Sequence, residues 1–418
     1  MRAVSSAAYS SDTSVQGTND DAQVSKMSCA KAGYFKDDFI HFFVKKSSRR
    51  SPLINRGYYS RHAALRHLLL DFLKRSYERG IQCQVLCLGA GFDTTWFQLH
   101  QDSPHLLPTR YLEVDFKEVT QRKVTIISGQ DSLKDRIKQH VSSASTSASV
   151  PGKPACVGTN SVQPSDLVPP APFTAASVRQ QSGGEVAAVS IIPDGVEAAA
   201  VEYLSGAAPI LAVKDAGEVE AGVKLDVQGG TLISSCYSIL PVDLKDLTAL
   251  EAATQRAGLD PDLPTYILSE CVLVYMEPSD SAAVIKWLAG HFKTAALVVY
   301  EQIKPDDAFG QQMCSNLESR GCPLRGIIST PTLEAHCQRM RIGGWSDAKS
   351  HDMDTIYKLY LDPVDRARME RLEIFDEFEE WHMIQEHYSI TIGMNNDNAK
   401  ECTSNSETGS FMTGFGFT

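Results

Sequence analysis

A short apolar run that ends in a Gly-x-Gly turn constrains the fold of this chain most. The run Gln84–Leu88 is followed by Gly89 and Gly91, and then by a segment with helical spacing. Glycine lets the backbone turn tightly and approach a ligand closely, so this order is typical of nucleotide-binding α/β folds. The dinucleotide fingerprint needs a third glycine at position 94, where this chain has Thr94. The pattern therefore disfavours NAD and favours the shorter glycine turn of S-adenosylmethionine (SAM) enzymes. The alternative is that Gly-x-Gly is an ordinary turn that binds no ligand.

The rest of the chain repeats the alternation of strand-like runs and helical stretches. Strands that alternate with helices predict a parallel sheet covered on both faces. Further strands are predicted at Tyr111–Val114, Tyr237–Pro241, Thr265–Leu268, Ala295–Tyr300 and Tyr388–Ile392. Helices are predicted at Tyr59–Arg79, Phe116–Ile127, Leu244–Ala257, Ser279–Phe292 and, as one long acidic helix, Pro363–Glu386.

Acidic residues follow successive predicted strands. Glu113 and Asp115 end the second strand, Asp243 follows the third and Glu270 the fourth. In doubly wound sheets an acid at the second strand end accepts hydrogen bonds from ribose hydroxyls. The alternative is that Glu113 and Asp115 are ordinary solvated loop charges. Since ligands bind at the carboxyl edge of such sheets, the repetition favours a binding site.

Composition divides the chain into a core, an insert and two tails. Small residues and proline dominate from about 142 to 235, so we expect a mostly disordered insert over about 129–206. We expect a disordered tail over residues 1–24 and a polar tail over residues 399–418. The rest of the chain, 25–398, is expected to be one α/β domain interrupted by the insert. The net charge of −11 argues against an extended nucleic-acid partner. We expect no membrane span, reduced cysteines and a cytoplasmic location.

Seven blocks of the sequence resemble leucine carboxyl methyltransferases. They lie within 24–128 and about 207–391. Their sequences are KAGYFKDDFIHFFV (31–44), INRGYYSR (54–61), LGAGFDTTWF (88–97), YLEVDF (111–116), VDLKDL (242–247), LSECVLVYM (268–276) and YEQIKPDDAFGQQM (300–313).

The resemblance implies a class I SAM-dependent methyltransferase fold, Rossmann-like with a seven-stranded sheet and an N-terminal helical lid. It also implies methylation of the C-terminal leucine carboxylate of the protein phosphatase 2A catalytic subunit. We therefore expect this subunit as the partner, and we expect the present chain to be a monomer. The SAM contacts implied by the resemblance, together with the second glycine of the turn, are Lys26, Arg61, Gly89, Gly91, Asp115, Asp243, Leu244 and Glu270.

Several of these side chains also have a physical rationale. Arg61 can grip a carboxylate of SAM or of the substrate through two hydrogen bonds, or it is a surface charge on its helix. Asp243 and Leu244 would flank adenine. Glu270 would pair with the cationic end of SAM, hold a Tyr or Arg in place, or be purely structural.

Arg56 and Tyr275 are further candidates for gripping the substrate carboxylate. Arg56 is alternatively a buried ion-pair partner, and Tyr275 alternatively a packing residue. Glu301 either orients a cation in the pocket or is solvated. The histidines of the N-terminal half are not needed by the chemistry and are expected on helix surfaces or in packing; these are His41, His62 and His67.

Methyl transfer to a carboxylate needs no general base. A C-terminal carboxylate has a pKa of about 3.3–3.7 and is already ionised at neutral pH. The protein then has to position and partly desolvate it, so Arg61 should orient the carboxylate more than neutralise it. No metal site is expected.

Three other functions remain as alternatives. A sister branch of the same family acts in tRNA wybutosine synthesis, but typically adds kelch repeats of about 50 residues, and only residues 392–418 follow Thr391 here. A catalytically silent phosphatase-binding module would lose the acids and glycines of the SAM site. A NAD dehydrogenase lacks its third glycine.

Overall fold

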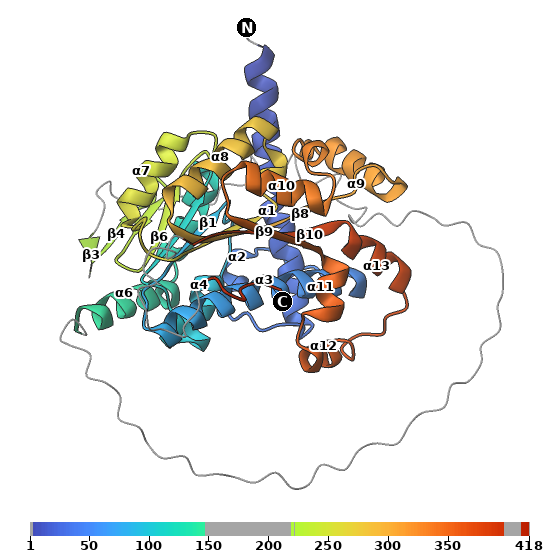
Figure 1. The fold of residues 1–418 in the computed structure, drawn as a ribbon. Helices are drawn as coiled ribbons and strands as arrows, with labels where there is room; N and C mark the ends of the chain where they lie inside the picture. Colours follow the sequence, from blue (N-terminus) through green and yellow to red (C-terminus); the bar gives the residue numbers. More distant parts are fainter. Residues whose placement is uncertain (1–2, 147–218, 221, 397–410, 418) are drawn as a thin grey trace, which may run out of the picture. The chain divides into compact units, whose positions relative to one another are not determined.

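A ten-stranded mixed sheet forms the centre of the protein, in the order β3-β4-β5-β6-β2-β1-β7-β8-β10-β9. The computed structural model describes residues 3–146, 219–220, 222–396 and 411–417 (Figure 1). The strands are β1 (Gln84–Leu88), β2 (Arg110–Asp115), β3 (Val219–Glu220), β4 (Val223–Asp226), β5 (Thr231–Ile233), β6 (Tyr237–Pro241), β7 (Thr265–Glu270), β8 (Thr294–Gln302), β9 (Asp347–Asp352) and β10 (Tyr388–Asn396).

The predicted α/β class and its parallel strands are confirmed. β6, β2, β1, β7 and β8 pair in parallel, so their carboxyl ends share one edge, and β10 pairs antiparallel with β8. The predicted count of seven strands is too low. The antiparallel strands β3, β4 and β5 extend the sheet beyond β6, and β4 and β5 also pack against the helix at Lys117–Ser128.

Helices cover both faces of the sheet. The helices are α1 (Ala3–Lys31), α2 (Ile40–Phe43), α3 (Pro52–Arg79), α4 (Thr95–Asp102), α5 (Lys117–Ser128), α6 (Asp131–Thr146), α7 (Leu247–Ala257), α8 (Pro278–His291), α9 (Ala308–Ser319), α10 (Leu333–Ile342), α11 (Met353–Leu359), α12 (Pro363–Met369) and α13 (Phe378–Glu386), with short 3-10 turns η1 (Pro104–Leu106), η3 (Leu273–Tyr275) and η4 (Ile327–Ser329).

Strand side chains alternate between these two helical layers. Leu86 and Leu88 of β1 face α7, α8 and α10 in a buried core, whereas Val85 and Cys87 face α3. Figure 1 shows α7, α8 and α10 on one side of the sheet and α3 and α4 on the other. A ligand that lies between α3 and the sheet would therefore contact the strand residues that face α3, such as Val85 and Cys87.

The predicted disordered tail over residues 1–24 is wrong for residues 3–24, which belong to α1. Polar helices of this kind gain little from propensity, so tertiary contacts must hold them. Four polar pairs link α1 to the core: Asp12 with Lys245, Gln16 with Glu118, Asp20 with Arg122, and Asp21 with Arg320. These contacts fall on residues far along the chain, which composition does not reveal.

The polar tail predicted at 399–418 is also wrong where the structure describes it. Phe411 and Phe415 are buried with their rings edge-on to Phe72 of α3, at centroid distances of 5.1 and 5.9 Å. Arg75 donates hydrogen bonds to the carbonyl oxygens of Thr413 and Gly414. We call residues 411–417 the C-terminal strap. The strap packs on Phe72 of α3, whose ring also contacts Tyr266 of β7.

The remaining predictions on organisation have mixed outcomes. The predicted insert lies outside the described residues over 147–206, whereas 131–146 form α6. The predicted helix Pro363–Glu386 is instead α12 and α13, with 370–377 between them. Glu373 in this break accepts hydrogen bonds from Tyr34, Arg49 and Asn55, and these contacts hold the chain away from the helical path.

No helix in the described residues is both long and apolar enough to cross a membrane. The cysteines within these ranges are all free thiols.

Candidate functional site

The turn after β1 requires both of its glycines. Gly89 and Gly91 have φ angles of +57° and +52°, in the left-handed region that side chains disfavour. A Cβ on Gly89 would lie 2.5 Å from Cγ2 of Val272, and one on Gly91 2.5 Å from Oδ1 of Asn19. The turn therefore requires glycine at both positions, and Val272 and Asn19 pack directly against it.

Asp115 lies beside this turn at the carboxyl end of β2. One carboxylate oxygen accepts the N–H of Gly91 and the other accepts the N–H of Phe116, both at 2.7 Å. Burial raises the pKa of Asp115 to about 6, while these two N–H groups favour the ionised form. Each oxygen keeps a lone pair, so the carboxylate is held in place and can still accept hydrogen bonds from a ligand's hydroxyls.

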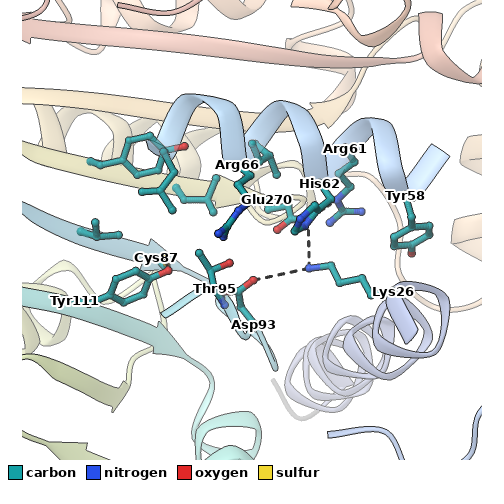
Figure 2. Close-up of a pocket in the computed structure, with 15 residues that line it drawn as sticks. Lys26, Tyr58, Arg61, His62, Arg66, Cys87, Asp93, Thr95, Tyr111 and Glu270 are labelled. Carbon is teal, nitrogen blue, oxygen red and sulfur yellow. Dashed lines mark hydrogen bonds and ion pairs between the residues drawn. The ribbon is translucent and has the colours of Figure 1, made fainter. Parts of the chain in front are cut away.

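A pocket lies between α3, the C-terminal part of α1 around Lys26, and the sheet (Figure 2). Its polar part is formed by charged and hydrogen-bonding groups, and its inner part by apolar residues of α3 and by strand residues of the α3-facing set. The lining residues are Lys26, Tyr58, Arg61, His62, Leu65, Arg66, Leu69, Val85, Cys87, Asp93, Thr95, Tyr111, Tyr266, Leu268 and Glu270.

Glu270 is the centre of an ionic network in this pocket. It forms an ion pair with Arg61 Nε, and Lys26 Nζ lies 3.6 Å from Oε1 of Glu270 and 3.9 Å from Oδ2 of Asp93 (Figure 2). Burial alone would raise the pKa of Glu270, but Arg61 and Lys26 outweigh it and lower this pKa to about 2. The guanidinium of Arg61 also lies 4.7 Å from the ring centre of Tyr300. The network fixes Arg61 and keeps Glu270 charged.

The predicted cofactor residues therefore fall into two groups. Lys26, Arg61 and Glu270 meet in the pocket, whereas Gly89, Gly91 and Asp115 meet at the turn beside it. The third strand end carries the remaining two predicted residues: Asp243 is exposed and Leu244 is buried. They follow β6, which pairs with β2, and thus lie on the same edge of the sheet.

Arg56 does not line the pocket. It is 4% exposed, and its guanidinium lies 3.8 Å from the ring centre of Phe375, with Phe378 and Trp381 also within reach. Its predicted grip on the substrate carboxylate has no support in this placement. The alternative of a buried ion-pair partner is not found among the described residues, where the cation packs against aromatic faces.

Tyr275 is also absent from the pocket lining. It belongs to η3 and packs beside Val274, Leu324 and Ile327. Burial raises its pKa well above the ordinary value for tyrosine. The packing alternative describes this tyrosine better than a grip on the carboxylate.

Two further acidic residues considered as site candidates, Glu113 and Glu301, form buried ion pairs in the core and do not line the pocket. Glu113 pairs with Lys123 of α5 and accepts a hydrogen bond from Tyr237, and burial raises its pKa to about 7 although Lys123 opposes this. Glu301 pairs with Arg339 of α10 at 2.8 Å. The interpretations of Glu113 as a ribose ligand or a solvated charge, and of Glu301 as a pocket or solvated residue, are therefore wrong.

Sequence reasoning missed Asp93, His62 and Arg66 in the pocket. His62 stacks on Phe35 with ring centres 4.0 Å apart, so its predicted packing role is found, but inside the pocket. Burial and the nearby Arg66 lower the pKa of His62 to about 3, which keeps the ring neutral. His62 and Arg66 are four residues apart and so share one face of α3, a signal that was available in the sequence. His41 and His67 are exposed as expected.

The residues present fit SAM in charge and hydrogen-bonding capacity. A positioned carboxylate beside a glycine turn suits a ribose, and a pocket with both cations and carboxylates suits the amino and carboxylate groups of an amino acid. No cluster of metal-ligating side chains occurs in the residues that the structure covers.

Known proteins of one family are similar to this chain. A family model described as leucine carboxyl methyltransferase matches residues 4–146 and 224–289. The chain is 39% identical to the leucine carboxyl methyltransferase 1 homolog of Arabidopsis thaliana, over 92% of this chain and 90% of that protein. It is 30% identical to leucine carboxyl methyltransferase 1 of Rattus norvegicus, over 91% of this chain and 89% of that protein.

A second kind of relative is also similar. The human tRNA wybutosine-synthesizing protein 4 is 33% identical over 92% of this chain, but the match covers only 44% of that protein. This chain thus spans less than half the length of that relative.

Proposed function

The chain belongs to the leucine carboxyl methyltransferase family and is a SAM-dependent carboxyl methyltransferase; we propose that its substrate is the C-terminal leucine of the protein phosphatase 2A catalytic subunit. The product would be a methyl ester of the terminal α-carboxylate. The observation that carries the proposal is the pocket in which Lys26, Arg61 and Glu270 meet beside the glycine turn.

The chain's own residues account for how the cofactor would be held. Asp115 would accept hydrogen bonds from the ribose hydroxyls, and Gly89 and Gly91 would let the backbone come close to the ligand. Lys26 and Arg61 would bind a carboxylate, and Glu270 would bind an ammonium group. When bound, SAM supplies an electrophilic methyl group.

The acceptor carboxylate needs only orientation and a dry environment. With a pKa of about 3.3–3.7 it is ionised at neutral pH, so no side chain has to remove a proton. His62, whose pKa is about 3, stays neutral and does not serve as a base. Arg61 shares its charge with Glu270, which weakens its hold on a second carboxylate. A weaker hold leaves the acceptor oxygen more nucleophilic, so Arg61 orients the carboxylate without neutralising it.

The experiment is transfer of label from methyl-labelled SAM to the phosphatase core enzyme. We expect base-labile label on the catalytic subunit, and none after deletion of its terminal leucine. A parallel reaction contains tRNA that carries the wybutosine precursor. Label on the tRNA but not on the phosphatase would reject the proposed substrate and favour the second kind of relative.

We further propose that the enzyme acts as a monomer in the cytoplasm. The free thiols among the described cysteines support a reducing compartment. Light scattering at micromolar concentration tests the first statement, and fractionation with antibody detection tests the second.

A further inference from the structure

The lining of the pocket carries more positive than negative charge. Three cationic side chains, Lys26, Arg61 and Arg66, face two carboxylates, Asp93 and Glu270. The pocket is partly withdrawn from water, where an uncompensated charge is costly. Asp102 lies outside this lining and offsets the charge of Arg66 at 3.8 Å, so the case for a ligand rests on the hydrogen-bonding capacity of these side chains.

Arg66 is the cation with a hydrogen-bonding group to spare. Arg61 and Lys26 are both engaged with Glu270. The nearest carboxylate to Arg66 is that of Asp102, whose Oδ2 lies 3.8 Å from Nη2. Nη1 of Arg66 is buried and has no hydrogen-bond partner in the described part of the chain. A buried N–H of a charged group without an acceptor costs stability, so a ligand acceptor would relieve this cost.

The position of Arg66 brings this free group toward the interior of the pocket. Figure 2 shows Arg66 and Arg61 on either side of His62 along α3, with the Arg66 guanidinium pointing toward Thr95 and Asp93. The neutral ring of His62 separates the two cations. Arg66 can therefore meet a ligand group that the network of Arg61, Lys26 and Glu270 does not hold.

We propose that Arg66 binds a carboxylate of the ligands that fill this pocket. The carboxylate belongs either to the amino-acid part of SAM or to the C-terminal residue of the protein substrate. The first source depends only on cofactor binding, and the second rests on the proposed function. In either case Nη1 of Arg66 fixes one of these carboxylates, which leaves Lys26 and Arg61 to orient the other.

The test compares Arg66→Gln with wild type by isothermal titration calorimetry. S-adenosylhomocysteine carries the amino-acid carboxylate, and 5′-methylthioadenosine is the matching nucleoside without it. If Arg66 holds the cofactor carboxylate, affinity for S-adenosylhomocysteine falls about tenfold or more, and that for methylthioadenosine stays within about twofold. If it holds the substrate carboxylate, both affinities stay and KM for the phosphatase rises about tenfold or more.

Two further variants guard the interpretation. Arg66→Lys keeps the cation, so it should recover part of the lost affinity and provides a second reading if the Gln variant folds poorly. Arg79→Gln removes an arginine from the exposed end of the same helix and should change none of these values.

Unchanged affinity and unchanged KM in Arg66→Gln would overturn the assignment, as would an equal loss for both nucleosides. A wild-type protein that bound S-adenosylhomocysteine without methylating the phosphatase would refute the proposed substrate. The two nucleosides would still decide the role of Arg66 in that case.

Discussion

Replacement of Glu270 by Gln should destabilise the protein at neutral pH. The structure lowers the pKa of this carboxyl from 4.5 to about 2, through Arg61 and Lys26 acting against burial. At 1.36 kcal/mol per pKa unit, the shift corresponds to about 3 kcal/mol of stabilisation of the ionised form. Its side chain is 16% exposed, so screening by water reduces the expected loss to about 2–3 kcal/mol.

The sign of the pH dependence follows from the direction of this shift. Because the folded pKa lies below the unfolded one, the contribution of Glu270 is fully present above about pH 4.5. It is lost as the pH falls toward 2. The difference in unfolding free energy between wild type and Glu270→Gln should therefore be the same at pH 7 and pH 6, and should shrink below pH 4.5.

Equilibrium urea unfolding, followed by tryptophan fluorescence, measures this difference. The control is Glu277→Gln, which removes a carboxylate that pairs with Arg325 and is 54% exposed. An exposed pair of this kind contributes about 0–1 kcal/mol. If Glu270→Gln lost no more stability than Glu277→Gln, the reasoning that Glu270 is the charged centre of the pocket would be refuted.

Three further predictions concern the turn, the core and the strap. Gly91→Ala should lower the affinity for S-adenosylhomocysteine about tenfold in calorimetry, because Gly91 has a left-handed φ and an added Cβ would meet Asn19. Gly290→Ala is the control, since its Cβ would enter open space, and it should leave the affinity unchanged. Equal effects of the two substitutions would contradict this prediction. Lys123→Met should cost about 3–5 kcal/mol in urea unfolding because Glu113 stays buried without its partner, and a loss under 1 kcal/mol would refute it. Phe415→Ala should cost about 3–4 kcal/mol in the same assay, and an unchanged midpoint would show that the C-terminal strap is dispensable.

The sheet was predictable because its parallel strands are buried on both faces. Such strands read as short apolar runs, and each strand predicted within the described residues is a strand of the structure; the short strands considered at 186–192 and 207–213 lie outside those residues. β9, with the sequence DAKSHD, has no such run. It is an edge strand that pairs with β10 on one side only, so its polar side chains can face water.

The two ends of the chain were misjudged for a shared reason. Composition averaged over 399–418 is polar and hides the aromatic residues of the strap, such as Phe411 and Phe415, which find their partner in Phe72 of α3. The first half of α1 is rich in serine and has no apolar periodicity, and the helix is held by ion pairs to residues such as Lys245 and Arg320. Contacts between distant parts of a chain leave no local periodicity to detect.

The site was predictable where a residue type has one plausible use at a strand end. Gly89, Gly91, Asp115 and Glu270 lie at or just after the ends of parallel strands, whose carboxyl ends share one edge of the sheet, so their proximity could be predicted. The position of Arg56 could not, because an arginine on a helix can face a ligand or an aromatic cluster, and only the fold places Phe375 beside it. Arg66 was missed because it follows no strand and stands outside the seven blocks that resemble the family, although it lies four residues after His62 on the same helix.

Mass spectrometry of the phosphatase catalytic subunit tests the central claim most directly. The subunit is incubated with this protein and SAM, and its C-terminal peptide is then fragmented. We predict one added methyl group, on the carboxylate of the terminal leucine, that is removed by mild base. An unmodified C-terminal peptide, or a methyl group on any other residue, would contradict the account.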